Sequence, residues 1–401
     1  MPQAPSPTTL VGSLGGAPYR IVVPEEWNGT LLVYVHGYNE ATIPPMVAPP
    51  NVDETALLSR GFALAGSQFK EGGLAIKEGS QNTLALTNYF RGHVGNPRQI
   101  IAWGRSMGGL ITLGLLDKYP GIFAAGVALC PPAAGTPLRF DRALDFSVAY
   151  AAAFGWPAEW GSIGDLRDDL DWATDVLPKV AATLIPARRG LWEFVRLVNH
   201  LPMEGFYVPA APDPIPYRLA QVLFATVTRA ELESLAGGPP TQNLDHTYSL
   251  SPDEKIYLAG LGVNADGLLA QMNTMKFSAA RSARNYAEHY LTPLGSSDRP
   301  VLTLHTATDS VATADHESVL RARFVAAGTV ESLLQVYTKA QGTADAPAFC
   351  THCAFTPAQT LATLDAMTSW LETGARPGPS FFPAALGFDH SYVPPAWPWP
   401  Y

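Results

Sequence analysis

The sequence is poor in charge and lacks the long apolar runs that a membrane protein needs. Charged residues make up only 15% of its 401 residues, against roughly 25% in an average soluble protein. No window approaches the ~18 consecutive apolar residues of a membrane span. The 26 basic and 35 acidic side chains give a formal net charge of −9. This acidic balance, without runs of Lys or Arg, argues against a nucleic-acid partner.

Cysteine is scarce, and the N-terminus lacks a recognisable targeting signal. The three cysteines are an odd number, which does not suggest a disulfide scaffold, although one bridge plus one thiol stays open. The segment Met1–Pro7 has neither the basic nor the apolar part of a signal peptide. We therefore expect no signal peptide in the chain as given; a secreted protein whose signal has been removed remains an alternative. The compartment and the oligomeric state are left open.

Apolar segments alternate with helical patterns in the first third of the chain. Hydrophobic residues make up 47% of the sequence, enough for a large core. The predicted strands are Tyr19–Pro24, Leu31–Val35, Phe62–Ser67, Gln99–Trp103 and Ala125–Leu129. The predicted helices between them are Thr55–Ser59, Ser80–His93 and Leu110–Lys118. Apolar strands alternating with helices are typical of an α/β fold, with a mostly parallel sheet covered by helices on both faces.

The pattern changes in the middle of the chain, which is helical with almost no strand signal. We expect helices there at Asp141–Phe154, Asp165–Ala182, Leu191–Val198, Arg218–Leu235 and Gly267–His289. The alternation then returns, with strands at Val301–His305 and Ser332–Tyr337 and helices at Ala314–Ala327 and Pro357–Glu372. These shifts predict an α/β core of residues 1–135 and 296–375, a large helical cap of residues 136–295, and a tail of residues 376–401 rich in Pro and aromatics.

The most informative motif is Gly104-Arg105-Ser106-Met107-Gly108, a G-x-S-x-G between an apolar strand and a helix. A serine on such a sharp turn has a strained backbone, and glycines two residues away on either side let neighbouring chain approach closely. The turn lifts the Oγ atom above the sheet edge, and the N-terminus of the following helix can stabilise negative charge. Ser106 is therefore the candidate nucleophile. A Gly-rich turn with an idle serine is the alternative.

With this motif in this context, the chain resembles the α/β-hydrolases over residues 17–135 and 296–375. The resemblance implies a catalytic triad in the order Ser, acid, His. The acid is expected after a late strand, where Asp309 is the only carboxylate of its loop. The histidine is expected between the last strand and the last helix, where only His352 is found. A solvated loop Asp is the alternative for Asp309, and His390 in the tail is the reserve candidate for the base.

The resemblance also implies two backbone N–H donors for an oxyanion. One belongs to Met107, directly after the nucleophile, and the other to Tyr38, in the segment His36-Gly37-Tyr38. A plain turn at the end of a strand is the alternative for this segment. In the implied mechanism, His352 takes the proton from Ser106 while an acidic partner orients the imidazole. No cofactor and no metal are expected.

The segment Cys350-Thr351-His352-Cys353 admits more than one interpretation. A zinc site needs four ligands, and the sequence has no second Cys/His cluster. A thioredoxin-like role needs a C-x-x-C at the start of a helix. The His352-Cys353 pair resembles that of tannases and fungal-type feruloyl esterases, in which a disulfide joins a cysteine beside the catalytic His to one beside the catalytic Ser. This chain departs from that pattern, since Arg105 precedes Ser106.

Within the resemblance, Cys130 is the candidate partner of Cys353. Cys130 ends the strand after the one that delivers Ser106, so we expect it at the same edge of the sheet that the His352 loop must reach. We therefore predict a Cys130–Cys353 disulfide that leaves Cys350 free and favours an oxidising compartment. The alternative is that all three cysteines are small buried hydrophobic residues.

The predicted cap carries many aromatic side chains and one acidic stretch. The aromatic residues include Trp156, Trp160, Trp172, Trp192, Phe194, Phe206 and Tyr207. Most are expected in the cap's own core, and some against the acyl pocket, since the cap of this fold roofs the serine. The acidic residues are Asp165, Asp168, Asp169, Asp171 and Asp175. They are expected on a solvated helix face or, as in aminopeptidases of this fold, around a substrate amine.

The expected activity is hydrolysis of carboxylic esters through an acyl-serine intermediate, on a small-molecule or polymeric ester. A peptidase or amidase of the same fold is the first alternative. A non-catalytic binding module on this fold is the second, because a fold does not by itself imply a function. Neither the acyl group nor the alcohol group can be named from the sequence.

Overall fold

The chain divides into two compact units. The computed structural model describes residues 7–38, 40, 42–201, 215–309, 311–339 and 352–399. The first unit comprises Met1–Ala134 and Pro293–Pro395, and the second comprises Gly135–Thr292 and Ala396–Tyr401. The Pro-rich and aromatic tail of residues 376–401 is thus divided between the two units at Pro395.

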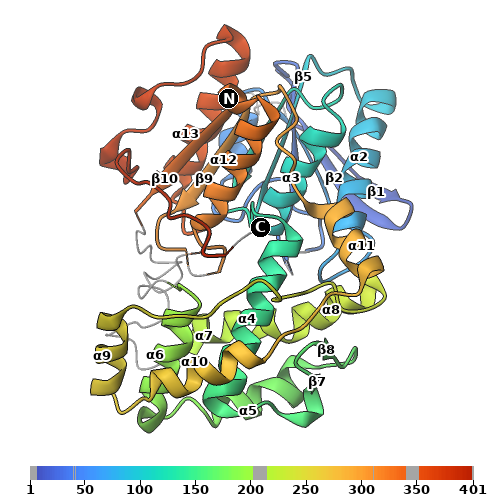
Figure 1. Cartoon of the computed structure of the whole chain (residues 1–401). Coiled ribbons are helices and arrows are strands. Elements are labelled where there is room, and N and C mark those ends of the chain that lie inside the picture. The colour runs from blue at the N-terminus through green and yellow to red at the C-terminus, as the bar shows by residue number, and fades with distance from the viewer. Residues whose placement is uncertain are drawn as a thin grey trace. The chain divides into compact units, whose positions relative to one another are not determined.

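An eight-stranded sheet forms the centre of the first unit (Figure 1). Its strands are β1 (Thr8–Leu14), β2 (Ala17–Val23), β3 (Thr30–Val35), β4 (Ala63–Ser67), β5 (Gln99–Arg105), β6 (Ala125–Leu129), β9 (Val301–Thr306) and β10 (Leu333–Thr338). Their order in the sheet is β1-β2-β4-β3-β5-β6-β9-β10. β2 pairs antiparallel with β1 and β4, and the strands from β4 to β10 run parallel. The predicted, mostly parallel sheet is therefore confirmed.

Helices cover both faces of this sheet. They are α1 (Glu54–Leu58), α2 (Ile76–His93), α3 (Met107–Lys118), α12 (Asp315–Ala327) and α13 (Pro357–Thr373). Leu32 and Tyr34 of β3 belong to a buried cluster that includes residues of α1 and α13. The alternate residues of β3 point to the opposite face, where α2 and α3 contact the strand. Because both faces are covered, β3, β6 and β9 are buried at every position, which explains the apolar runs of β3 and β6. β9 also buries the polar side chains of Thr303, His305 and Thr306.

The first strand lies outside the strands predicted from the sequence. β1 forms a hairpin with β2 through Gly15 and Gly16, whose φ angles are +59° and +91°. Two-residue turns of this kind need positive φ, and a Gly-Gly pair is among their signals. The strand was therefore detectable, but every residue in it is exposed or half-buried, so the apolar pattern alone did not reveal it.

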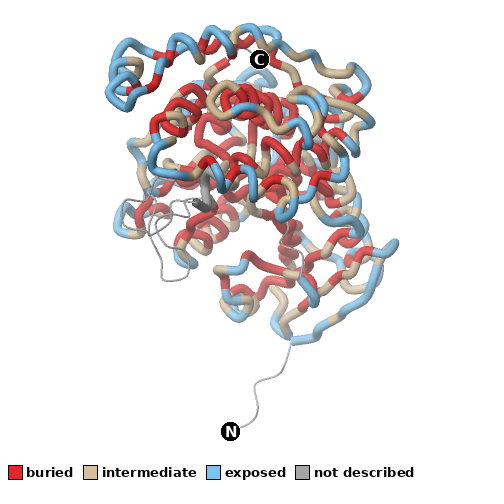
Figure 2. Tube along the Cα trace, turned by 90° about the horizontal axis from the view of Figure 1, so that it is seen from below, coloured by how far each residue is buried: buried red, intermediate tan, exposed pale blue. Residues whose placement is uncertain are grey.

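The second unit is mainly helical. Its helices are α4 (Thr136–Phe154), α5 (Leu177–Ala181), α6 (Arg189–Val198), α7 (Ile215–Ala225), α8 (Val227–Ala236), α9 (Pro252–Gly260), α10 (Ala265–Thr274) and α11 (Arg281–Leu291). Trp160, Trp192 and Phe194 are buried in its own hydrophobic cluster, as expected for the aromatic residues of the cap. Figure 2 shows buried chain in the interior and exposed chain at the periphery. Together with the sheet, this helical insertion completes the α/β-hydrolase fold that the sequence predicts.

Three predicted helices of this insertion are wrong. The helix predicted over 218–235 is two helices, α7 and α8, divided at Thr226, whose backbone is not helical. Residues 165–182 do not form one helix: β8 (Asp165–Leu166) pairs with β7 (Gly161–Ser162), and a short π-helical turn precedes α5. Gly161, with a φ angle of +86°, lies at the start of this hairpin. The helix predicted over 267–289 is two helices, because α10 ends before Met275, whose backbone is extended.

Candidate active site

The turn between β5 and α3 holds Ser106 in a strained conformation. The φ angle of Ser106 is +54° and its ψ angle is −122°, a combination that L residues rarely adopt. A Cβ atom on Gly104 would lie 2.5 Å from the Val35 carbonyl oxygen, and one on Gly108 would lie 2.6 Å from the His36 carbonyl oxygen. Both glycines are thus required by close backbone approach from the neighbouring strand β3, which is the steric reason for the motif.

Ser106, His352 and Asp309 form a chain of hydrogen bonds. The His352 Nε2 atom lies 2.9 Å from Ser106 Oγ, and its Nδ1 atom lies 2.7 Å from Asp309 Oδ2. Because an ionised carboxylate can only accept, Nδ1 carries the proton, which leaves Nε2 to accept from the serine hydroxyl. Ser106 and His352 are half-buried, while Asp309 is buried. The three side chains come from the ends of β5 and β9 and from the segment before α13.

Backbone groups hold the carboxylate of Asp309 in place. Its Oδ1 atom accepts from the N–H groups of Val311 and Ala312, at 2.8 and 2.9 Å. Its Oδ2 atom is then left to face His352. Asp309 is therefore not the solvated loop residue that the sequence left as an alternative, because its side chain is fully buried.

The two candidate oxyanion donors lie at the ends of neighbouring strands. Met107 is buried as the first residue of α3, where a helix provides no internal acceptor for its N–H group. Tyr38 follows β3 in a turn whose Gly37 N–H donates to Glu40 Oε2 at 2.8 Å. The His36 ring stacks on Phe69 with the ring centres 3.9 Å apart. This stacking holds His36, two residues before Tyr38, against Phe69.

Glu40 and Arg105 join the two candidate donor segments. The Arg105 Nε atom lies 3.2 Å from Glu40 Oε1, and both side chains are about four-fifths buried. Arg105 directly precedes Ser106, and Glu40 lies two residues after Tyr38. The ion pair therefore ties the turn of Tyr38 to the turn of Ser106. The sequence analysis predicted no role for Glu40 or for Arg105. The one feature of the sequence that could have indicated this ion pair is the acidic residue shortly after His36-Gly37.

A disulfide bridge lies beside the histidine. Cys130 and Cys353 are bonded, with their Cα atoms 5.3 Å apart. Cys130 follows β6, and its N–H donates to the Leu304 carbonyl at 2.7 Å. Cys353 directly follows His352, so the bridge anchors the histidine's segment to the sheet edge. Cys350, expected to be a free thiol, lies outside the described residues.

The same cysteines and His352 form the one His/Cys/Asp/Glu cluster of the described residues that has metal-ligand spacing. The ligand atoms of Cys130, His352 and Cys353 lie within 4.8 Å of one another. Metal ligation by cysteine requires the thiolate, whereas both sulfurs are joined in the disulfide. The Nε2 atom of His352 also faces Ser106. The donor set therefore does not fit a metal in this bonded state.

The reserve candidate for the base lies elsewhere. His390 donates through Nε2 to the Phe382 carbonyl oxygen at 2.7 Å, whereas the imidazole that meets Ser106 is that of His352. The acidic stretch of the second unit is also engaged locally. Asp171 accepts from the N–H groups at the start of the π-helical turn, and Arg167 pairs with Asp169 and Asp175. Phe206 and Tyr207 lie outside the described residues.

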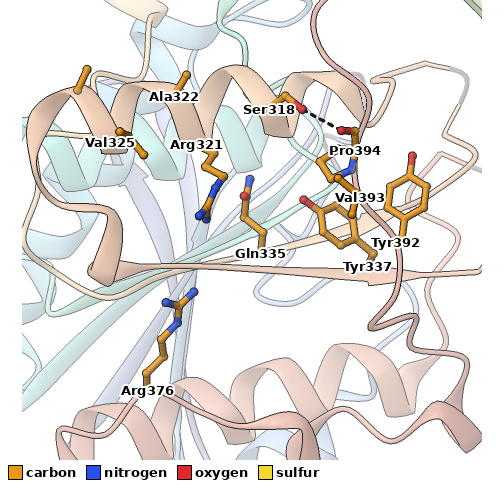
Figure 3. A pocket seen from close by; sticks show the side chains of 11 residues that line it. Ser318, Arg321, Ala322, Val325, Gln335, Tyr337, Arg376, Tyr392, Val393 and Pro394 are labelled. Carbon is orange, nitrogen blue, oxygen red and sulfur yellow. Dashed lines mark hydrogen bonds between the residues drawn. The ribbon is translucent and has the colours of Figure 1, made fainter.

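A separate cavity of about 620 Å³ opens beside β10, the edge strand of the sheet (Figure 3). Arg321 of α12, Gln335 and Tyr337 of β10, and Arg376 are among the side chains that line it. None of the three triad candidates lies in its wall. The cavity is thus distinct from the candidate active site.

Comparisons with known proteins give similarity at the level of structure. No protein-family model and no curated protein sequence matches the chain. Similar solved structures include an esterase from Aspergillus oryzae, with 13% identity, 92% of this chain and 80% of that chain covered, and a TM-score of 0.44. Feruloyl esterase B from Aspergillus oryzae has 13% identity, the same coverages and a TM-score of 0.43. Proline iminopeptidase from Mycobacterium smegmatis has 12% identity, coverages of 91% and 97%, and a TM-score of 0.39.

These similar structures include esterases and a peptidase. We assign the fold from the strand order of the sheet and from the turn at Ser106. The similarity to these distant structures is not used for the assignment. Among the helices of the described residues, none has the length and apolar character required to cross a membrane.

Proposed function

We propose that the chain is a serine hydrolase that cleaves carboxylic esters through an acyl-serine intermediate, without a cofactor. The observation that carries the proposal is the hydrogen-bond chain from Ser106 through His352 to Asp309. Its support is the conformation of Ser106, which places the hydroxyl at the N-terminus of α3. A binding module would have no need for this combination.

In the proposed reaction, Ser106 Oγ attacks the acyl carbon as His352 Nε2 takes its proton. The resulting imidazolium is stabilised by Asp309, whose ionised carboxylate accepts a hydrogen bond from the Nδ1–H group while the proton stays on the ring. The N–H groups of Met107 and Tyr38 receive the developing oxyanion. The ester C–O bond then breaks as His352 gives its proton to the leaving alcohol. In the second half, His352 Nε2 takes a proton from the water molecule that attacks the acyl-serine, and it returns this proton to Ser106 Oγ as the carboxylic acid leaves.

Ser106→Ala is the direct test. The purified variant should lose ester hydrolysis and labelling by a fluorophosphonate probe, while circular dichroism and the melting temperature stay close to those of the wild type. Retention of more than a few per cent of activity would exclude Ser106 as the nucleophile.

The substrate class is tested by two sets of chromogenic substrates. We expect turnover of p-nitrophenyl esters of graded acyl length, and little turnover of aminoacyl anilides. The opposite preference would favour a peptidase of the same fold. Two of the acidic residues expected around a substrate amine, Asp169 and Asp175, are already paired with Arg167.

A further inference from the structure

We propose that His305 is a positioning residue of the candidate active site, acting as an imidazolium ion paired with Glu317 behind Asp309. The inference rests on the proposed function, since Asp309 is taken as the acid of the triad. The known roles of a triad acid do not require a second imidazole on its far side. The structure nevertheless places one there, fully buried, with a carboxylate partner of its own.

The pair is placed where charge is costly. His305 lies near the end of β9 and Glu317 lies in the first turns of α12, and neither side chain is exposed. Taking two charges out of water carries a desolvation penalty that the mutual attraction often only balances. A buried ion pair is therefore weak evidence that the pair stabilises the fold. The position of His305 beside Asp309 points to a role in the candidate active site instead.

The hydrogen-bond partners of this pair fix the proton on Nε2 and agree with a second proton on Nδ1. The His305 Nε2 atom lies 2.6 Å from the Ala312 carbonyl oxygen, which can only accept, so Nε2 carries a proton. The Nδ1 atom lies 3.0 Å from Glu317 Oε1. Glu317 Oε2 accepts from the Thr303 hydroxyl at 2.7 Å and from the Gln335 amide at 2.6 Å. With Glu317 ionised, its carboxylate accepts all three donors at once and Nδ1 is the second protonated nitrogen of the ring, which is the state that we propose.

The electrostatic surroundings agree with this assignment. Burial of the ring opposes its positive charge, but the hydrogen bond to Glu317 and the negative charges of Glu317 and Asp309 outweigh it. Together these interactions raise the pKa of His305 to about 8. The ring is therefore mostly charged at neutral pH.

A single residue, Ala312, connects His305 to the acid of the triad. Ala312 accepts from His305 through its carbonyl oxygen and donates to Asp309 Oδ1 through its N–H group. In addition, His305 Nε2 lies 3.7 Å from Asp309 Oδ2, the oxygen that faces His352. His305 thus acts on Asp309 in two ways: it fixes the residue that orients the carboxylate, and it places a positive charge behind that carboxylate.

Among the groups that contact Glu317 directly (His305, Thr303 and Gln335), only Gln335 is partly exposed. Gln335, half-buried in β10, donates to Glu317 and also lines the cavity beside the edge strand (Figure 3). Tyr337, on the same strand, is buried, and its pKa is raised by burial and by the negative charge of Glu317. The charged groups in contact with His305 are Asp309 and Glu317. Tyr337 is its register partner on β10, and His352 contacts Asp309. The neighbouring strand β6 contributes no ionisable side chain.

The protonation state can be measured without any activity. In the full chain labelled with ¹⁵N-histidine, we expect both ring nitrogens of His305 to be protonated at pH 7, with its signals assigned by their loss in His305→Gln. A neutral ring at pH 7 would overturn the proposal. If His305→Gln fails to fold, Glu317→Gln provides the second comparison, because its amide no longer stabilises the imidazolium.

The effect on the triad is measured by the titration of His352. Removing the positive charge should raise the midpoint of His352, both in the NMR titration and in the acidic limb of kcat/KM, by about 0.5 to 1 pH unit in His305→Gln. We expect a smaller shift in Glu317→Gln, which removes both charges. His390→Gln is the matched control, since His390 also donates to a backbone carbonyl in the same unit, and it should leave the midpoint unchanged.

A purely structural role would give a different result. In that case kcat would fall with stability, while the midpoint of His352 would stay within 0.2 pH units of the wild type, and the proposal would be wrong. Failure of the proposed function is recognised separately, as the absence of ester turnover and of fluorophosphonate labelling in a folded wild-type chain. The NMR titration of His352 still decides on His305 in that event.

Discussion

Replacement of Cys130 and Cys353 by alanine should lower the free energy of unfolding by up to about 5 kcal/mol. The bridge joins residues 223 positions apart in the sequence. In the chain-entropy description, closing a loop of this length removes about 18 cal/mol/K from the unfolded ensemble, which is about 5 kcal/mol at 25 °C. This value is an upper bound, because an insertion that stays folded inside the loop shortens the flexible chain that the bridge constrains.

The loss should extend to catalysis, because Cys353 is bonded in sequence to His352. Without the bridge, the segment that carries the imidazole loses its covalent attachment to the end of β6. A misplacement of about 1 Å in a catalytic group can cost on the order of 10²-fold in rate. We therefore expect kcat to fall by about 10- to 100-fold, with a smaller change in KM.

Urea unfolding followed by tryptophan fluorescence measures the first effect. The double variant Cys130→Ala/Cys353→Ala is compared with the wild type, with and without dithiothreitol, and with Cys350→Ala as the control that keeps the bridge. The reasoning is refuted if the double variant and the wild type unfold within about 1 kcal/mol of each other. It is also refuted if denatured protein from oxidising conditions contains three reactive thiols.

Three further changes test the geometry of the site. Asp309→Asn should lower kcat by about 10⁴-fold at nearly constant melting temperature, because an amide no longer selects the tautomer with a free Nε2; a loss below 100-fold in the ester assay would contradict this. Because the pKa of His305 is raised in the folded protein, its protonation stabilises the fold. This contribution is complete below pH 6.5 and is lost as the pH rises through about 8. Urea titrations from pH 6 to 9 should therefore show a fall about 2 kcal/mol larger in the wild type than in His305→Gln; parallel curves would contradict it. Glu40→Gln should lower kcat about tenfold with little change in KM, and adding Arg105→Gln should cost little more, because the two side chains act as one pair; full additivity in the double-mutant cycle would exclude their coupling.

The parts of the fold that could be predicted from the sequence have local signals. The turn at Ser106 needs two glycines because neighbouring carbonyl oxygens lie where their Cβ atoms would be, and this requirement is visible as a motif. The strands β3 and β6 are apolar at almost every position because helices cover both faces of the sheet. Such runs distinguish them from the exposed β1, which was not predicted.

The contacts that join distant segments could not be predicted in the same way. Glu40 and Arg105 meet only because β3 and β5 are neighbours in the sheet. Glu317 reaches His305 only because α12 folds back along β9, and 12 positions separate the two residues. In the second unit, Asp171 caps a short turn and Arg167 pairs across it, so an acidic stretch that resembles a helix face forms a hairpin and a turn instead.

Backbone strain gives an independent argument for the position of the site. Among the described residues, five that are not glycine have positive φ angles: Phe69, Ser106, Cys130, His200 and Cys353. Such conformations cost on the order of 1–3 kcal/mol each and persist only where the surroundings impose them. In the first unit, Ser106 is the candidate nucleophile, Cys130 and Cys353 form the bridge beside His352, and Phe69 stacks on His36 in the turn of Tyr38. The strained positions of this unit therefore all hold the segments that bring Ser106, His352 and the oxyanion donors together, which is where strain is expected if geometry at this edge of the sheet is required for catalysis.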